Sequence, residues 1–249
     1  MNKRGQVTIF VIVAVVIVSI VLVMFVFPKM GFFVEDIEPN SYLKKCIEPN
    51  TQEILRLVVQ SGGYAEPTNY LEYEGNKIQY LCYTAENYKP CLIQQPLLVN
   101  HVEGEIKKFV EPKAKECLQN LKNEYEGNGY SVQASPGELN VELVPGSVDV
   151  EFISEMTLTK ERTQTFEKFD VEVETEIYDL LMTSMSILDF ESTLGDSGTE
   201  FYMNYYPDLR IEKTRLDNGT VYELSNVITK DEFKFATRSL VWPPGYGMI

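Results

Sequence analysis

The sequence predicts an α+β fold, with a single N-terminal transmembrane helix and an extracellular head. In the head, a disulfide-bearing helical part is followed by an antiparallel β-sheet. Three observations lead to this prediction. Residues 7–27 contain no charge, Gly or Pro; apolar residues recur at helical spacing within residues 41–127; and apolar and polar residues alternate in several stretches after residue 130. Helical spacing indicates amphipathic helices, and alternation indicates half-buried strands.

The apolar run is the first element. A helix of this length extends roughly 30 Å, about the thickness of the hydrocarbon core of a bilayer. Lys3 and Arg4 precede the run, whereas only Lys29 follows it before a group of acids. The positive-inside rule therefore places the N-terminus in the cytoplasm and the head outside, in a single-pass protein of the cell membrane. The expected segments are a basic leader at 1–6, the transmembrane helix at 7–28 and a hinge at 29–40.

The start of the run carries a second motif. The segment KRGQVTIF, residues 3–10, resembles the class III (type IV prepilin-like) signal peptides of archaeal surface proteins, and the whole chain resembles single-anchor archaeal surface proteins. The resemblance implies that a prepilin-type peptidase cuts between Gly5 and Gln6 and leaves the helix on the mature protein. Phe10 stands where the family has Glu, and Pro28 interrupts the helix that pilins continue into the head. Both departures favour a tethered head over a filament subunit.

The charge of the chain excludes one class of partner. All 37 acidic residues lie after residue 29, and the formal net charge is −15. Nucleic acids and anionic lipid headgroups bind basic surfaces, so nucleic acid is not an expected partner. An acidic surface suits a solvated extracellular domain.

All four cysteines, at positions 46, 82, 91 and 117, lie in the expected exterior part. An even number of cysteines in an exported chain indicates disulfides, and four cysteines allow three pairings. We expect Cys82–Cys91 to close the CYTAENYKPC loop and Cys46–Cys117 to join two helices. No CxxC spacing or neighbouring His indicates zinc.

The helical part, residues 41–127, contains a faint internal repeat. The segments KKCIEPNTQEIL at 44–55 and KKFVEPKAKECL at 107–118 align without gaps. Because Pro favours the first helical turn, each copy is expected to start or kink a helix at Pro49 or Pro112. The first helix should end at SGGY, where Gly can adopt the left-handed cap, and the second should end near EGNGY.

The β-rich part, residues 128–249, begins where alternation replaces helical spacing. Three stretches set apolar residues between acids and predict strands with an acidic outer face: 139–143, 148–152 and 171–177. An amphipathic helix is expected from 177 to 188. Asn218-Gly219 is a strong turn sequence and predicts a β-hairpin, which the C-terminal tail follows.

No motif predicts catalysis. GDSG at 195–198 resembles the nucleophile segment of trypsin-like proteases, but Thr199 stands where that family has Gly, and His101 lacks the family's histidine motif. We interpret GDSG as a surface loop. His101 is the only histidine, and no P-loop, HExxH, GxSxG or dinucleotide motif is present, so the sequence predicts no cofactor or metal.

Two groups of residues are candidates for modification or contact. Asn218-Gly219-Thr220 is an N-glycosylation sequence on the expected turn. Aromatic residues near Pro and Gly, in EFYMNYYPDL and in the C-terminal tail, are typical of binding interfaces, although capping of the head's own core is the alternative. These aromatic candidates are Phe201, Tyr202, Tyr205, Tyr206, Trp242 and Tyr246.

The sequence thus favours a non-catalytic, membrane-anchored extracellular surface protein for interaction or assembly. Its expected partners are the lipid bilayer and other surface proteins or copies of itself. Two alternatives are a type IV pilin-like filament subunit, with the hydrophobic helix as its packed shaft, and an ectoenzyme that uses paired carboxylates.

Overall fold

The computed structural model describes residues 13–21 and 38–239, and the chain divides into two compact units, residues 1–39 and 40–249. In the first unit, residues 13–21 are helical. Within the described ranges, no helix has both the length and the apolar character needed to cross a membrane. The rest of the predicted transmembrane helix, the leader with Gly5 and Gln6, and residues 29–37 of the hinge lie outside the described residues.

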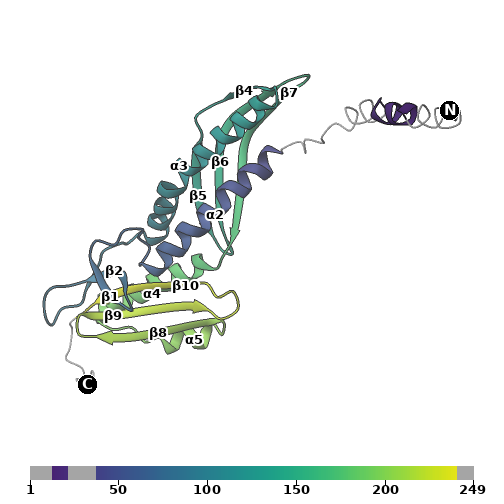
Figure 1. Cartoon of the computed structure of the whole chain (residues 1–249). Coiled ribbons are helices and arrows are strands. Elements are labelled where there is room, and N and C mark those ends of the chain that lie inside the picture. Colours follow the sequence, from purple (N-terminus) through teal and green to yellow (C-terminus); the bar gives the residue numbers. More distant parts are fainter. Residues whose placement is uncertain (1–12, 22–37, 240–249) are drawn as a thin grey trace, which may run out of the picture. The chain divides into compact units, whose positions relative to one another are not determined.

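The second unit is an α+β fold, as the sequence predicts (Figure 1). Its helices are α2 (Pro39–Gln60), α3 (Leu98–Gly127), α4 (Ile177–Leu194) and α5 (Glu200–Tyr205). Its strands are β1 (Tyr70–Tyr73), β2 (Asn76–Tyr83), β3 (Leu92–Ile93), β4 (Ser131–Ala134), β5 (Glu138–Val144), β6 (Ser147–Thr159), β7 (Thr163–Glu174), β8 (Leu209–Leu216), β9 (Gly219–Asn226) and β10 (Glu232–Arg238).

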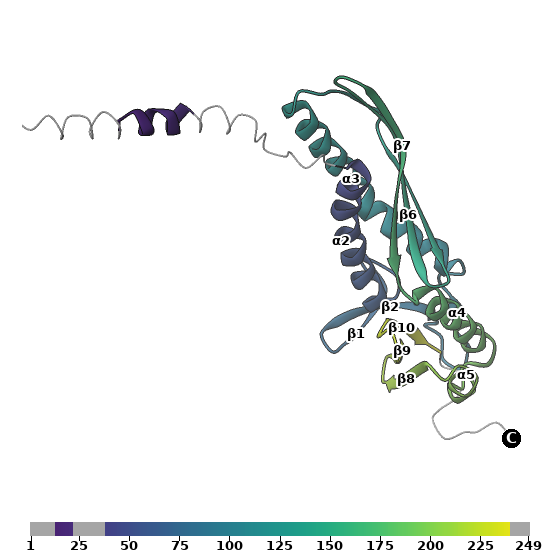
Figure 2. The ribbon, with the colours of Figure 1, turned by 90° about the vertical axis from the view of Figure 1, so that its right-hand side faces the viewer.

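The strands form two sheets. In the first, β6 pairs with β4, β5 and β7, and every pair is antiparallel. The second sheet is mixed, with the order β1-β2-β10-β9-β8 and with β3 beside β2; only the β2–β10 pair is parallel. The helices α2 and α3 lie along the first sheet, whereas α4 and α5 pack against the second (Figure 2).

The predicted acidic strands are present, because alternation gives each of them one face to bury. In β6, every second residue from Val148 to Leu158 is buried. The alternation was expected to continue to Ile177, but β7 ends at Glu174. The hydroxyl of Thr175 accepts a hydrogen bond from the Ile177 amide at 3.3 Å, within the short turn that separates β7 from α4.

The two repeat segments lie in different helices, and neither proline starts its helix. Pro49 lies inside α2 and Pro112 inside α3. An internal Pro removes one backbone hydrogen bond, and in α2 the Asn50 side chain donates to the Cys46 carbonyl in the same turn, at 2.7 Å. The first helix ends where expected: Gly62 has φ +73°, and a Cβ there would lie 2.9 Å from Cβ of Gln79. Only Gly fits this turn.

The predicted helical part also contains strands that the sequence did not indicate. Residues 41–127 include β1, β2 and β3, and β2 pairs with β10 near the C-terminal end of the described chain. Ile78 to Cys82 of β2 are all buried. Such a continuous buried stretch has no alternation to reveal it. The two predicted parts therefore share one sheet.

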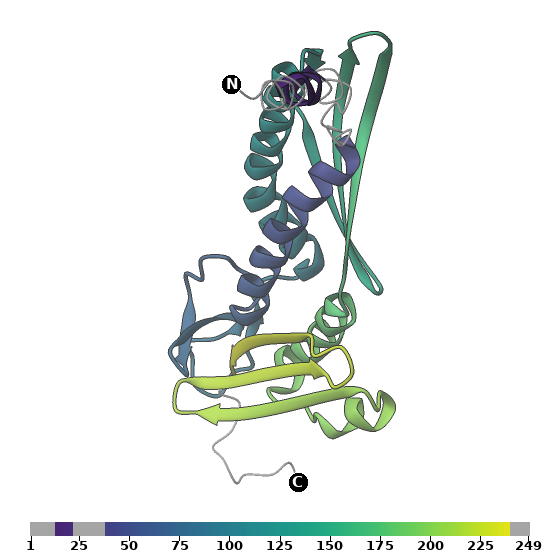
Figure 3. The same ribbon diagram turned by 45° about the vertical axis from the view of Figure 1, so that its right-hand side comes forward.

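The predicted hairpin is present between β8 and β9. Leu216 pairs with Gly219, so the turn residues are Asp217 and Asn218, one position earlier than expected. Figure 3 shows this hairpin as a long ribbon at one end of the second unit, with the β6–β7 hairpin at the other end and α2 running obliquely between them.

Candidate functional site

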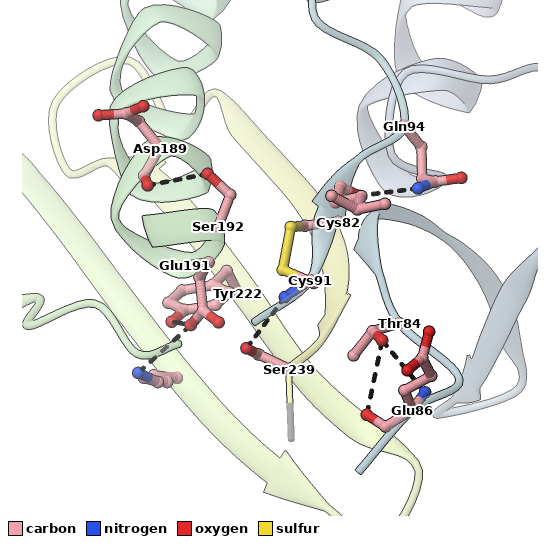
Figure 4. Close-up of a disulfide and its surroundings, with 12 residues drawn as sticks. Cys82, Thr84, Glu86, Cys91, Gln94, Asp189, Glu191, Ser192, Tyr222 and Ser239 are labelled. Atoms are coloured by element: carbon pink, nitrogen blue, oxygen red, sulfur yellow. Dashed lines mark hydrogen bonds and ion pairs between the residues drawn. A yellow bond between two sulfur atoms is a disulfide. The ribbon is translucent and has the colours of Figure 1, made fainter. Parts of the chain in front are cut away.

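Two disulfides hold the second unit together, with the pairing that the sequence favours. Cys46 of α2 bonds Cys117 of α3, with a Cα–Cα distance of 6.1 Å. Cys82 of β2 bonds Cys91 just before β3, with a Cα–Cα distance of 5.3 Å. The Cys91 amide donates to the Ser239 hydroxyl at 3.3 Å, so the small loop is tied to the end of β10 (Figure 4).

A buried polar cluster joins α4 to the second sheet. Glu191 of α4 is 2% exposed and accepts a hydrogen bond from the hydroxyl of Tyr222, which is fully buried (Figure 4). The Lys213 ammonium lies 3.8 Å from the Glu191 carboxylate and 5.0 Å from the centre of the Tyr222 ring. Glu191 lies on the buried face of α4, at helical spacing from Ile187 and Leu188. A charged residue at such a position is the sequence signal that could have located the cluster.

The GDSG loop closes over this cluster. Asp196 forms an ion pair with Lys213 and another with Arg215, the latter at 2.9 Å. Lys213 also donates to the Ser197 carbonyl at 2.9 Å. Ser197 is 2% exposed, and its hydroxyl has no hydrogen-bond partner among the described residues. The loop is therefore held in place by ion pairs, and its serine lies inside the protein.

The environment shifts the pKa values of this cluster in different directions. Burial raises the pKa of Glu191, and the Tyr222 hydrogen bond and the Lys213 charge oppose that shift. Burial also raises the pKa of Tyr222, and the neighbouring Glu191 adds to the effect. Burial alone would raise the pKa of Asp196, but hydrogen bonds and charge from Lys213 and Arg215 lower it. These groups stabilise the packing of α4 against β8 and β9.

His101 and Ser197 have different neighbouring residues. It is part of α3, its ring lies 4.0 Å from the ring of Tyr64, and burial lowers its pKa. The contacts of Ser197 come from Glu191 and Lys213 instead. The structure therefore shows no contact that would make a catalytic pair of His101 and Ser197 within the described residues.

The aromatic candidates in α5 and directly after it divide into one core residue and an exposed group. Tyr202 is 7% exposed, and its hydroxyl forms a 2.9 Å hydrogen bond with the Ser186 hydroxyl of α4. Phe201, Tyr205 and Tyr206 are 68%, 73% and 56% exposed, and we call them the aromatic surface. The Phe201–Tyr205 and Tyr205–Tyr206 ring centres are 6.0 and 5.8 Å apart. Trp242 and Tyr246 lie outside the described residues.

The acidic outer face of β5, β6 and β7 borders a hollow of about 730 Å³ beside α3. The Glu103 carboxylate of α3 accepts a hydrogen bond from the Leu143 amide of β5 at 3.0 Å. Lys168 pairs with Glu151 and, at 3.3 Å, with Asp170, and the Lys168 hydrogen bond lowers the pKa of Glu151. Within the described ranges, no group of three His, Cys, Asp or Glu side chains is placed to hold a metal ion.

Asn218, the predicted glycosylation site, is exposed in the β8–β9 turn. Its backbone carbonyl accepts a hydrogen bond from the Tyr80 hydroxyl at 2.8 Å, which fixes the turn against β2.

Comparison with protein-family models, with curated proteins and with solved structures gives no match to this chain.

Proposed function

We propose that the chain is a non-catalytic surface protein, anchored in the membrane by residues 7–27, whose extracellular head binds a protein partner through the aromatic surface. The observation that carries the binding role is the exposure of three neighbouring rings, Phe201 and Tyr205 of α5 and Tyr206 directly after it, while Tyr202 holds the helix to α4 from its buried side. Aromatic side chains dominate the energetics of protein interfaces, and neighbouring exposed rings mark interaction sites.

The membrane anchor is supported by residues 13–21. Their Val and Ile side chains are 48% to 59% exposed, so the described helix presents apolar surface on all sides. Its one hydroxyl group, on Ser19, donates to the Val15 carbonyl at 2.8 Å. A segment in lipid must satisfy its polar groups internally in this way.

The extracellular location is supported by the disulfides. All four cysteines of the chain are paired, and three of them, Cys82, Cys91 and Cys117, are buried. Disulfides of this kind persist in oxidising compartments and are rare in the cytosol. The non-catalytic role is supported by Glu191, whose carboxyl has a raised pKa but is buried and held by Tyr222 and Lys213.

The chemistry of the aromatic surface favours a basic, partly apolar protein partner. Exposed carboxylates of Glu200 and Asp208 flank the three rings in sequence. Lys and Arg are attracted both to carboxylates and to aromatic faces. The net charge of −15 opposes association with a second, equally acidic copy.

A binding experiment tests the partner chemistry. The full chain in detergent is titrated with a peptide of alternating Leu and Arg, and separately with a Leu–Glu peptide. We expect preference for the basic peptide and about tenfold weaker binding by the Phe201→Ala/Tyr205→Ala double variant. Tyr88→Ala is the control, since Tyr88 is 72% exposed at another site. Equal binding by the double variant and the wild type would refute the role of the aromatic surface.

A labelling experiment on intact cells tests the location. A protease added outside should release a disulfide-linked head fragment, and a membrane-impermeant thiol reagent should label none of the four cysteines until a reductant is added. Recovery of the chain in the cytosolic fraction with reactive thiols would exclude the proposed location. Fibres in which this chain is the repeating unit would favour the pilin-like alternative.

A further inference from the structure

The face of the second sheet that points away from α4 carries its own apolar cluster. Tyr80 of β2 pairs with Ala236 of β10, which pairs with Val221 of β9, so these three side chains share one face. The next residue, Tyr222, points to Glu191 of α4, and successive strand residues point to opposite faces. Leu71 and Ile78 complete the cluster, and Tyr73 and Tyr83 pack against it.

A pocket of about 730 Å³ lies next to this cluster, between the β1–β2 hairpin and the β8–β9 turn. Leu71 and Tyr80, which are 4% and 5% exposed, form its buried part. Tyr70 and Tyr83 line it and are partly exposed. The Tyr80 and Tyr83 ring centres lie 5.2 Å apart with their planes at 60°, so the two rings form a corner. Concave sites with several aromatic side chains are typical of ligand pockets.

The polar lining combines amides and carboxylates with one cation. Glu72 and Asp217 line the pocket and, within the described chain, have no ion-pair partner. The cation is Arg238, which already donates to the Thr84 carbonyl and lies 5.5 Å from the Tyr83 ring centre. The pocket therefore offers the carboxylates of Glu72 and Asp217 as free hydrogen-bond acceptors, whereas the Arg238 guanidinium already has partners.

This lining disfavours anions and leaves little free aromatic face for a cation. An anion would meet the Glu72 and Asp217 carboxylates without a free cation to pair with. A cation would compete with charges that already lie over the rings: Lys77 is 4.6 Å from the centre of the Tyr70 ring, and Arg238 lies over Tyr83. A neutral molecule with several hydroxyls fits both parts of the lining, because its hydroxyls can donate to the carboxylates while its C–H faces pack on the tyrosine rings.

The glycosylation sequence lies in the wall of the same pocket. Asn218 is one of the lining residues, and Tyr80 holds its backbone carbonyl at 2.8 Å. We propose that this pocket binds a neutral saccharide, either the glycan attached to Asn218 of the same chain or a separate cell-surface glycan. Attachment at Asn218 rests on the extracellular location proposed above, whereas the binding chemistry of the pocket does not.

The first arm of the test uses full chain made without glycosylation and kept in detergent. Chitotriose and mannotriose serve as neutral probes, and binding is measured by saturation-transfer NMR and titration. If the pocket binds a separate glycan, at least one probe binds, and Tyr70→Ala and Glu72→Gln each weaken binding about tenfold. Glu72 is exposed, so Glu72→Gln leaves the fold intact and keeps the test valid if Tyr70→Ala unfolds. Tyr88→Ala, outside the pocket, should bind normally.

The second arm uses protein from its native cells. Mass spectrometry determines whether Asn218 carries a glycan, and the thermal unfolding midpoint is measured before and after the glycan is removed. If the pocket holds the chain's own glycan, removal lowers the midpoint of the wild type by several degrees but has little effect on Glu72→Gln. The proposal is overturned in either of two cases, both of which require that no probe binds. In the first, Asn218 carries no glycan; in the second, removal of the glycan shifts the unfolding midpoints of the wild type and of Glu72→Gln equally. Probe binding by unglycosylated protein does not depend on where the protein is found, so failure of the location test remains a separate outcome.

Discussion

The Tyr222 hydroxyl of β9 donates a hydrogen bond to the Glu191 carboxylate of α4 in the interior of the head. Lys213 of β8 approaches the same carboxylate at 3.8 Å, and its ion pair with Asp196 fixes the loop after α4. A few polar side chains thus join a helix, two strands and a loop.

Glu191→Ala should lower the free energy of unfolding by about 2–4 kcal/mol, because it leaves the Tyr222 hydroxyl and part of the Lys213 charge without a partner in a buried site. Glu191→Gln should lower it less, since the amide oxygen still accepts from Tyr222. Denaturant titration of the full chain in detergent measures both changes. Equal losses in the two variants would show that the hydrogen bond is not the main contribution.

The same residue should give the head a distinctive pH dependence. Burial raises the pKa of Glu191 above its usual 4.5, so the unfolded chain loses this proton first as the pH rises. The contribution of Glu191 to stability therefore falls between about pH 4.5 and the raised folded pKa, and then stays constant. Thermal midpoints measured across this range should decline in the wild type relative to Glu191→Gln, and parallel curves would contradict the prediction.

Asp196 should act in the opposite sense. Despite burial, Lys213 and Arg215 lower its pKa below the usual 3.8. Its stabilising contribution is complete above about pH 4 and is lost as the pH falls through the lowered folded pKa. The Asp196→Asn variant should therefore be less stable than the wild type at neutral pH. Its stability should also fall by less than that of the wild type as the pH is lowered. Unfolding midpoints from pH 2 to 6 provide the measurement, and an unchanged acid response in the variant would count against it.

The two disulfides should differ in their contribution to stability. The Cys46–Cys117 bond spans a sequence separation of 71, and the Cys82–Cys91 bond one of 9. By loop-closure entropy, removal of the first should cost about 4 kcal/mol and of the second about 2–3 kcal/mol. Paired Cys→Ser variants of the full chain, compared by denaturant titration, check the order. A larger loss for the short loop would show that its tie to Ser239 outweighs chain entropy.

Gly62 and Gly75 form a matched pair for substitution, since both have positive φ, +73° and +82°. A Cβ at Gly75 meets nothing within 4 Å, whereas one at Gly62 lies 2.9 Å from the Gln79 side chain. Gly75→Ala should cost about 1 kcal/mol from backbone strain alone, and Gly62→Ala about 2–3 kcal/mol because a clash is added. Similar midpoints for the two variants would argue against close packing of the α2 end on β2.

Prediction from sequence succeeded where local pattern and burial agree. Alternation identified β5, β6 and β7, because each has one face in the core and one acidic face in solvent. The Asn218-Gly219 pair identified the β8–β9 hairpin within one residue.

Prediction failed where long-range contacts decide the structure. The burial of β2 comes from β10, which is distant in sequence, and the strand has no alternation of its own. Tyr202 was grouped with its exposed neighbours because sequence does not show that Ser186 of α4 would pack against it. Glu191 was overlooked for the same reason, since its partners Tyr222 and Lys213 lie on strands that follow it in the chain.

The parallel pairing of β2 with β10 has a consequence for biosynthesis. Tyr80 pairs with Ala236, so a nascent chain that emerges N-terminus first cannot complete the second sheet until β10 has been synthesised. Until then, the long-range pairing that slows folding is unavailable, and the apolar side chains of β2 are exposed to aggregation or to binding by chaperones. The second sheet therefore stays incomplete until β10 arrives, so its folding follows the synthesis of every other strand.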